Sequence, residues 1–449
     1  MKNTVIWGYH HEGAYPAITS LEERGLINII AWIGDKRKCP YCTEEIRDFS
    51  NGIFKATGFS NYDYKVYEEV YHSLFNFTDM YFRRFRDSDK TLYEMLNKFN
   101  VLFNYFFDLL SSKNVELVLF ANLPHVGADL ILYEVARKLG IKTVLCYQSL
   151  FPNKFFYVFD TPDFGDFNNV LPFDLQATIS LEKKHKKDLF YMKKVKKNKI
   201  APYLKSFSKW KKLGIKIRAW FGQDLLKLAM LTGLKYKRHQ EYKSYLKNNC
   251  IKVDMNEKFV YFPLHLQPEL TTAALGGIYA DQILAIERLV ALIPDSWYIY
   301  VKENPKQTSF VRGPWFFERL KLIKNVRLVA PAVDTYALLQ NCQFVATITG
   351  TAGWEAVSGG KNVLIFGQAW YKKLPGVFSY SETVDVNALM QYKINHKELE
   401  QKLNVLMAKL GTGVMDEAYK VMLEDYNPEK NTKYIEQFLE KIIAGTLEK

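Results

Sequence analysis

Cysteine is scarce in this chain of 449 residues. Its five cysteines stand at positions 39, 42, 146, 250 and 342. An odd and scattered set does not make the disulfide framework of small secreted proteins, so the composition predicts a protein of the reducing cytosol. Cys39 and Cys42 form one CxxC motif, but no second cysteine pair completes four zinc ligands. We interpret the motif as a surface turn, with a redox or metal-binding pair as the alternative.

Long apolar runs and a signal peptide are also missing. No uninterrupted apolar stretch approaches the ~20 residues that span a bilayer. The N-terminus runs through Lys2, Asn3 and Thr4 into a short apolar stretch, without the hydrophobic region and cleavage site of a secretory signal. The sequence therefore predicts a soluble or membrane-peripheral protein of the cytoplasm.

Acidic residues are nearly absent from one segment, residues 183–247. This segment carries 21 Lys and Arg against 3 Asp and Glu, whereas the whole chain has a net charge of +13. Its lysines alternate with large apolar residues such as Trp210 and Trp220, which is an amphipathic pattern. We predict that the segment contacts the anionic surface of the inner membrane. A helical linker packed on a domain is the alternative, and nucleic acid is not expected, because no recognition motif accompanies the charge.

Hydrophobic and aromatic residues, in contrast, are abundant. With 48% hydrophobic and 15% aromatic residues, the chain has enough material for two cores. Both halves alternate short apolar strands with helices, which predicts two Rossmann-like α/β domains with parallel sheets. We expect an N-terminal domain over 1–180, a basic helical insertion over 181–250, a second domain over 251–425, and a C-terminal helix over 426–449 that packs back on the body.

Polar loops follow several predicted strands of the first half. The side chains that these loops supply are His10, Glu12, His125 and Gln148. Ligands of open α/β sheets bind beyond the carboxyl ends of the strands, so we expect these residues near a cleft, with an ordinary strand-end loop as the alternative for His10 and Glu12. A later loop at 159–167, FDTPDFGDF, adds Asp163 as a further carboxylate, with a solvated loop acid as the alternative.

The stretch 344–367 of the second half has the pattern strand, glycine-rich turn, helix and strand. The free N–H groups at the start of such a helix favour an anion. Thr349 and Thr351 add hydroxyl groups beside Gly350, and Glu355 stands one helical turn later, where a carboxylate binds ribose hydroxyls. The pattern predicts a nucleotide site, with a purely structural βαβ turn as the alternative.

Two residues at upstream strand ends are expected beside the same predicted nucleotide site. His265 and Lys302 each follow a predicted strand of the second domain. Because the carboxyl ends of parallel strands lie at one edge of a sheet, we expect both side chains beside Gly350. A lysine beside the amides of a helix N-terminus suits a phosphodiester group.

Three motifs of the second half carry a family resemblance. YFPLHLQPE at 261–269, YVKENP at 300–305 and TITGTAGWEAVSGGKNVLIFGQAWY at 347–371 resemble the capsule polysaccharide biosynthesis family. Residues 116–167 show a weaker likeness. That family includes retaining sugar transferases that use CMP-activated 3-deoxy-ulosonic acids, such as Kdo and pseudaminic acid. The resemblance implies a GT-B-like architecture, in which two Rossmann-like domains enclose a central cleft, the second binding the donor nucleotide and the first the acceptor.

The resemblance also implies roles for individual residues. Lys302 and Asn304 would face the CMP phosphate, Gly350 and Thr351 would cradle it, and Glu355 would hold the ribose. The family often has histidine at the position of Asn304, and its Kdo-type members have an acidic pair where this chain has Gln148 and Ser149. The carboxylate candidates here are therefore Glu12 and Asp163, and the candidates for the acceptor base are His125 and His10. No cofactor and no metal are expected, because GT-B enzymes stabilise the leaving phosphate with fixed positive charge.

These expectations define one function and its alternatives. We predict a membrane-peripheral glycosyltransferase on the cytoplasmic face of the inner membrane. It would move a 3-deoxy-ulosonic acid from a CMP-sugar to an oligosaccharide or lipid-linked acceptor of a capsule or O-antigen, with retention. The alternatives are a UDP-sugar transferase or a nucleotide-sugar 2-epimerase on the same fold, and a non-catalytic capsule assembly factor.

Overall fold

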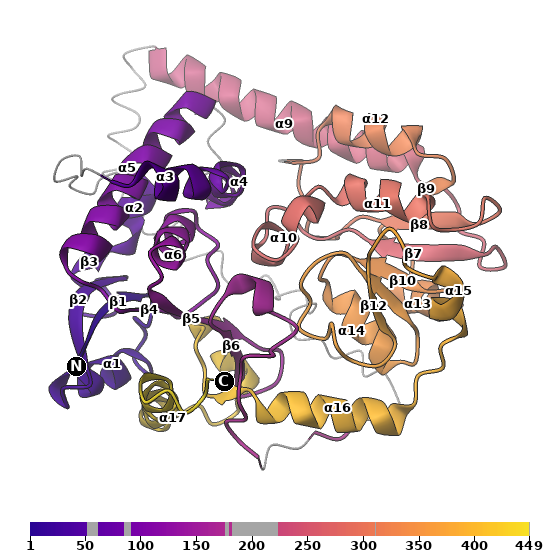
Figure 1. Ribbon diagram of the computed structural model, residues 1–449. Coiled ribbons are helices and arrows are strands. Elements are labelled where there is room, and N and C mark those ends of the chain that lie inside the picture. The colour runs from indigo at the N-terminus through magenta and orange to yellow at the C-terminus, as the bar shows by residue number, and fades with distance from the viewer. Residues whose placement is uncertain (52–61, 85–90, 176–178, 182–222, 310, 449) are drawn as a thin grey trace.

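The chain forms two α/β lobes, which lie side by side in the computed structural model shown in Figure 1. The structure describes residues 1–51, 62–84, 91–175, 179–181, 223–309 and 311–448. Two long helices mark the outer sides of the molecule. Helix α9 (Gln223–Asn249) runs across the top of this view from the first lobe to the second, and α16 (His396–Ala408) crosses back from the second lobe toward the first.

A seven-stranded sheet forms the centre of the first lobe, in the order β13-β6-β5-β4-β1-β2-β3. The strands are β1 (Lys2–Trp7), β2 (Ile27–Gly34), β3 (Glu44–Glu45), β4 (Leu117–Phe120), β5 (Lys142–Gln148), β6 (Lys154–Val158) and β13 (Gly411–Thr412). β1 to β5 are parallel, whereas β6 runs antiparallel to β5, and β13 antiparallel to β6. β4 is a continuous apolar run because a central parallel strand is buried on both faces.

Helices cover both faces of this sheet. They are α1 (Tyr15–Glu23), α2 (Ile46–Asn51), α3 (Tyr64–Tyr71), α4 (Leu74–Arg84), α5 (Leu92–Ser112) and α6 (Ala128–Lys138), with a 3-10 turn, η1, at Thr161–Asp163. In α5, Thr91 and Glu94 form a capping box at the start of the helix, and Phe99, Phe103 and Phe106 are buried in the core. This helix alone carries six of the aromatic residues of the chain.

The second lobe holds a six-stranded parallel sheet in the order β12-β11-β10-β7-β8-β9. Its strands are β7 (Phe259–Pro263), β8 (Tyr298–Lys302), β9 (Val326–Val329), β10 (Val345–Thr347), β11 (Val363–Ile365) and β12 (Val377–Ser379). Its helices are α10 (Leu270–Ala273), η2 (Gly277–Ala280), α11 (Gln282–Val290), α12 (Pro314–Leu322), α13 (Thr335–Asn341), α14 (Thr351–Ser358) and α15 (Val386–Gln391). The chain leaves β7 toward β8 and later returns to the other side of β7 at β10. Such a switch in strand order opens a crevice at the carboxyl ends of these strands.

The end of the chain completes the first lobe. After α16, strand β13 joins the edge of the first sheet, and η3 (Glu417–Met422) and α17 (Pro428–Ile443) follow. Helix α17 packs against α1 and buries Phe438 against Phe155 and Tyr157 of β6. The return to the first lobe therefore begins at β13, upstream of the expected C-terminal helix.

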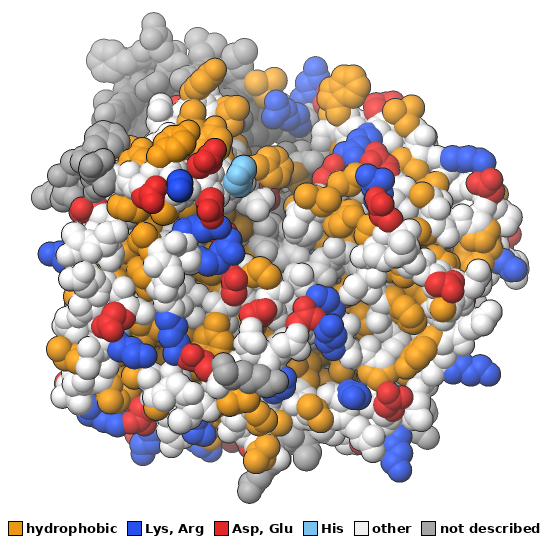
Figure 2. All heavy atoms as spheres, in the orientation of Figure 1, with side chains coloured by type: hydrophobic (Ala, Val, Ile, Leu, Met, Phe, Trp, Pro, Cys, Tyr) orange, Lys and Arg blue, Asp and Glu red, His pale blue; other side chains and the backbone are white. Residues whose placement is uncertain are grey.

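The predicted fold class, a GT-B-like pair of Rossmann-like domains, is confirmed by the two parallel-dominated sheets. Of the basic segment 183–247, residues up to 222 lie outside the described part, and the rest belongs to α9. No helix within the described ranges is long and apolar enough to cross a bilayer. Figure 2 shows positive and negative side chains interspersed over both lobes.

The CxxC motif differs from its expected place on the surface. Cys39 is fully buried and Cys42 nearly so. Cys42 packs so closely beneath Gly34 that a Cβ added to this glycine would lie 2.5 Å from the Cys42 Sγ. The turn itself is present, but its two thiols face inward because the loop after β2 folds over them.

Candidate functional site

A cavity of about 320 Å³ lies between the lobes, at the carboxyl ends of β7, β8 and β10. The first lobe contributes the end of β5 and Tyr419 to its wall. All eight residues that the sequence proposes for nucleotide binding line this cavity: His265, Lys302, Asn304, Thr349, Gly350, Thr351, Glu355 and Gln148. The fold thus brings together side chains from loops more than 200 residues apart.

Lys302 supplies a buried positive charge to the cavity. Its ammonium Nζ donates hydrogen bonds to the Val333 carbonyl oxygen at 2.6 Å and to Thr335 Oγ1 at 2.7 Å. Burial lowers the pKa of Lys302 from its ordinary value. An ammonium group has three N–H donors, so one remains for a ligand in the cavity.

The glycine-rich turn brings backbone amides to the same place. Gly350 is the N-cap of α14, and the first amides of this helix have no partner within the helix. A Cβ at Gly350 would lie 2.9 Å from Thr347 Oγ1 and 3.1 Å from the His265 ring. Glycine is therefore required here by close approach rather than by an unusual backbone angle, since φ is −69°.

His265 joins the strand ends of β7 and β10. Its Nε2 lies 3.0 Å from Thr347 Oγ1 and accepts the Thr349 backbone N–H at 3.4 Å. The His265 backbone N–H donates to Gln282 Oε1 at 2.7 Å. Burial lowers the pKa of His265 to about 4, so the ring is neutral at physiological pH.

Thr349 and Gln148 also use their polar side-chain atoms within the protein. Thr349 Oγ1 donates to the Thr271 carbonyl at 3.1 Å. Gln148 Oε1 accepts the backbone N–H groups of Met415 and Asp416, at 2.7 and 3.2 Å, and its Nε2 donates to the Lys154 carbonyl at 2.9 Å. Gln148 therefore anchors the segment after β13 against the cavity.

A second cavity, of about 500 Å³, lies in the first lobe beyond the ends of β1 and β4. His10 and His125 line it, together with His11, Lys38 and Asn122 from the same lobe and residues 415–418 from the returning chain. His125 Nδ1 lies 2.6 Å from the Leu123 carbonyl oxygen and must therefore carry a proton. In the neutral ring Nε2 is then the acceptor, which is the form that a general base requires.

The other two predicted catalytic residues lie outside both cavity walls. Glu12 is exposed and forms an ion pair with Lys420 at 2.8 Å. Asp163 lies in η1, where its carboxylate accepts a hydrogen bond from Asn169 at 3.1 Å. Sequence position alone placed both in strand-end loops, but their side chains turn toward surface partners.

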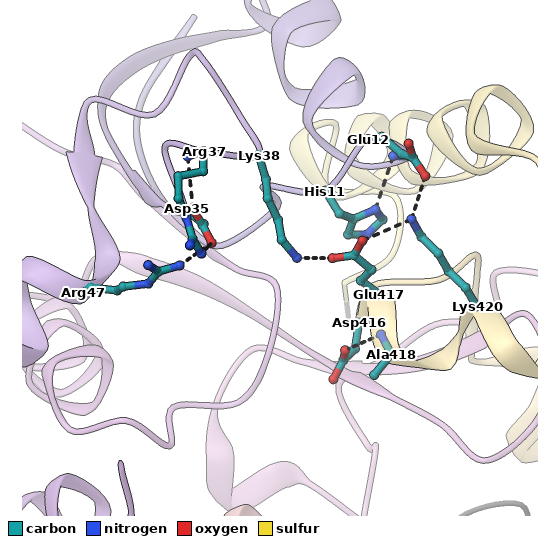
Figure 3. A network of polar contacts seen from close by, with 11 residues as sticks. His11, Glu12, Asp35, Arg37, Lys38, Arg47, Asp416, Glu417, Ala418 and Lys420 are labelled. Atoms are coloured by element: carbon teal, nitrogen blue, oxygen red, sulfur yellow. Dashed lines mark hydrogen bonds and ion pairs between the residues drawn. The ribbon is translucent and has the colours of Figure 1, made fainter. Parts of the chain in front are cut away.

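The carboxylates that do line the second cavity are Asp416 and Glu417. Figure 3 shows Glu417 between Lys38 and Lys420, which in turn binds Glu12. Residues 415–418 line the second cavity, and the next residue, Tyr419, lines the first, so one short segment forms a wall of both. Sequence patterns missed it because it stands about 400 residues from its partners and follows only a two-residue strand.

Two Rossmann-like lobes around a cleft define a GT-B-like fold, and the second lobe brings a lysine and a helix N-terminus to this cleft. The sequence profile described as "Capsule polysaccharide biosynthesis protein" matches residues 175–409, which is more than half of the chain. The chain belongs to this family, as its motifs indicated. A search of curated proteins finds no match.

Solved structures resemble the chain only remotely. KpsC from Thermosulfurimonas dismutans, described as a beta Kdo 2,7 transferase, is 16% identical over 46% of this chain and 62% of its own, with a TM-score of 0.25. The chain thus spans less than two thirds of that protein. UDP-GlcNAc 2-epimerases from Methanocaldococcus jannaschii and Neisseria meningitidis are 12% and 13% identical, over 99% of this chain and 100% of theirs, with TM-scores of 0.24 and 0.22.

Proposed function

We propose that the protein is a glycosyltransferase that moves a 3-deoxy-ulosonic acid, such as Kdo or pseudaminic acid, from a CMP-sugar to a capsule or O-antigen glycan. One observation carries the proposal. Lys302, the amides after Gly350 and the Glu355 carboxylate converge on one cavity between the lobes of a capsule-family chain. This set provides positive charge and amides for a phosphate, and a carboxylate for ribose hydroxyls.

The leaving group of such a donor is CMP. As the glycosidic bond breaks, negative charge develops on the phosphate, and the Lys302 ammonium and the α14 N-terminus stabilise it without a metal ion. Retention requires a carboxylate nucleophile or attack from the face of the leaving group. His125 and His10 are the bases proposed for the acceptor hydroxyl. Glu12 and Asp163 are the carboxylates proposed from the sequence. Asp416 and Glu417 are added to them, because these two residues line the second cavity.

The acceptor is proposed to occupy the second cavity. Its wall combines neutral imidazoles, the Asn122 amide and carboxylates, which together offer both donors and acceptors to sugar hydroxyls. We further propose that the enzyme works on the cytoplasmic face of the inner membrane, where its lipid-linked acceptors would be found. Lys237, Lys243 and Lys247, which belong to the basic segment, are exposed on α9 and would be available to that surface.

A donor screen tests this function. The purified protein is incubated with CMP-Kdo, CMP-pseudaminic acid, CMP-sialic acid and UDP-GlcNAc, and release of nucleotide is followed with and without EDTA. We expect CMP release from one ulosonic acid donor, unaffected by EDTA. Reaction of UDP-GlcNAc alone would establish the UDP-sugar alternatives, and binding of no nucleotide by calorimetry would favour an assembly factor.

A further inference from the structure

A fully buried ion pair lies behind the first cavity. Arg312 Nε donates to Glu303 Oε2 at 2.9 Å, and both side chains are 1% exposed. A buried pair recovers its desolvation cost only when its remaining polar atoms are also bonded. Here Arg312 also donates to Gln267 Oε1 at 2.5 Å and to the His265 carbonyl oxygen at 3.2 Å, and Glu303 Oε1 accepts the Asn304 N–H at 2.9 Å.

These bonds connect the loops that form the cavity wall. Arg312 binds the loop after β7 through Gln267 and His265, and Glu303 belongs to the loop after β8. Gln307 strengthens the same link, because its Oε1 accepts the Gln267 N–H at 2.8 Å and its Nε2 donates to the Gln267 carbonyl at 2.9 Å. The ion pair thus fixes the spacing between two strand ends that both face the ligand.

The third strand end is joined through His265. The Gly350 N–H donates to Thr347 Oγ1 at 3.3 Å, and the Thr347 hydroxyl lies 3.0 Å from His265 Nε2. His265 Nε2 also accepts the Thr349 N–H, so this nitrogen carries no proton in the neutral ring. The proton must then be on Nδ1, and this N–H is the remaining polar atom of a ring that lines the cavity.

We propose that the Arg312–Glu303 pair is the positioning device of the nucleotide cavity, and that it presents His265 to the ligand as a neutral N–H donor from Nδ1. This inference rests on the proposed function, since it takes the ligand to be a nucleotide monophosphate. Arg312 touches no ligand in this scheme and acts only through the two loops. Loss of the pair should therefore change two properties, the tautomer of the His265 ring and the affinity for CMP.

The test uses the full chain and a variant that leaves no unpaired charge. Arg312→Met combined with Glu303→Gln removes both charges, while the new amide can still accept the Asn304 N–H. The matched control is Arg319→Met, which breaks the ion pairs of Arg319 with Glu287 and Asp281 on the partly exposed side of the same lobe. CMP affinity is measured by calorimetry, thermal stability by calorimetric scanning, and the His265 tautomer by ¹⁵N NMR of histidine-labelled protein, with His265→Gln identifying the signal.

In wild type we expect the Nδ1–H tautomer at pH 7. In the double variant we expect a mixture of tautomers and at least tenfold weaker CMP binding, whereas Arg319→Met retains both properties of wild type. A Nε2–H tautomer in wild type, or a double variant with unchanged tautomer and affinity, would overturn the proposal. If wild type binds no CMP, the proposed function fails, and the tautomer readout still decides whether the pair positions His265.

Discussion

Lys302 and His265 line the same cavity, but the first side chain is charged and the second is neutral. The lysine carries a charge and is held by two oxygen acceptors, whereas the imidazole is neutral because burial disfavours its charged form. Lys302 would therefore give an anion a charge-assisted bond from a buried position, whereas Lys306, the other lysine of this cavity wall, is exposed. The affinity of the cavity for phosphate should depend on this lysine more than on any other single side chain.

Lys302→Met should weaken CMP binding by about 10- to 100-fold, since a hydrogen bond to a charged group contributes about 1.5–3 kcal/mol. Calorimetry measures the change. Lys361→Met is the matched control, because the Lys361 ammonium also donates to two oxygen acceptors of this lobe, the carbonyls of Gln340 and Cys342, but lies outside the cavity wall. Equal affinity in wild type and Lys302→Met would contradict the site.

Buried histidines should make stability fall in mild acid. Burial lowers the pKa of His265 and of His11 to about 4, from an ordinary value of 6.5. Between these values the unfolded chain binds more protons than the folded one, so the free energy of unfolding decreases as pH falls from 6.5 toward 4. We expect each histidine to contribute about 2 kcal/mol of this loss between pH 6.5 and 5. Urea unfolding of wild type, His11→Gln and His265→Gln at several pH values checks this. If the free energy of unfolding of the variants falls with pH as steeply as that of wild type, the prediction is refuted.

The residues predicted to bind nucleotide all line one cavity, whereas two of the four predicted catalytic residues lie outside both cavity walls. Strand ends are visible in a sequence, and His265, Lys302 and Gly350 needed only strand positions to be placed together. The orientation of Glu12 depends on Lys420, and that of Gln148 on the backbone of Met415, and neither partner is near in sequence. No local pattern encodes such contacts, because they form only when the chain end returns to the first lobe.

At the scale of elements, α14 and its N-cap decide how closely a ligand approaches the backbone. Gly350→Ala should push a Cβ into Thr347 Oγ1 and the His265 ring, and so weaken CMP binding at least tenfold with a smaller loss of stability. Gly313→Ala is the control, because Gly313 is also the N-cap of a helix in this lobe, α12, and a Cβ there meets no atom within 4 Å. Both N-cap changes cost similar intrinsic helix stability, so a difference in affinity belongs to the cavity.

The elements themselves were predictable where their patterns were strong. The apolar runs that became β4, β7, β8 and β10 have the continuous hydrophobicity of buried parallel strands. The antiparallel strand β6 and the short β13 were not expected. Edge pairing of β13 with β6 depends on the whole lobe, since two residues carry too little pattern to identify a strand.

At the scale of the whole molecule, the basic segment 183–247 adds a property that the lobes do not share. Changing Lys193, Lys194, Lys196 and Lys197 to glutamate should reduce flotation with anionic vesicles, because each lysine near such a surface contributes about 1 kcal/mol. The control changes four exposed lysines elsewhere to glutamate: Lys324, Lys393, Lys397 and Lys402. Binding of wild type should weaken as salt rises. Equal flotation of the two fourfold variants would assign the effect to net charge alone.

The two lobes must also stay in register, because residues from both form the first cavity. Asp166 of the first lobe pairs with Lys372 at 2.7 Å and Lys373 at 2.9 Å of the second, and Phe156 stacks on Trp370 at a ring distance of 5.7 Å. Gly165 lies inside this contact. Its φ is +93°, and a Cβ there would lie 2.3 Å from the Ala369 carbonyl oxygen. A carbonyl of the opposing backbone cannot move aside as a flexible side chain does, so any larger residue must separate the lobes.

Gly165→Ala should therefore loosen the contact between the lobes and weaken CMP binding, because Tyr147 and Tyr419 would withdraw from the cavity wall. Gly140→Ala is the matched control: its φ is +70°, so it imposes the same kind of backbone strain in the same lobe, but its Cβ would meet no atom within 4 Å. Small-angle X-ray scattering should show a larger radius of gyration for Gly165→Ala only, and calorimetry a lower affinity for CMP. If both variants lose the same affinity for CMP and keep the wild-type radius of gyration, backbone strain at a positive φ explains the loss. The contact between the lobes would then not be what maintains the cavity.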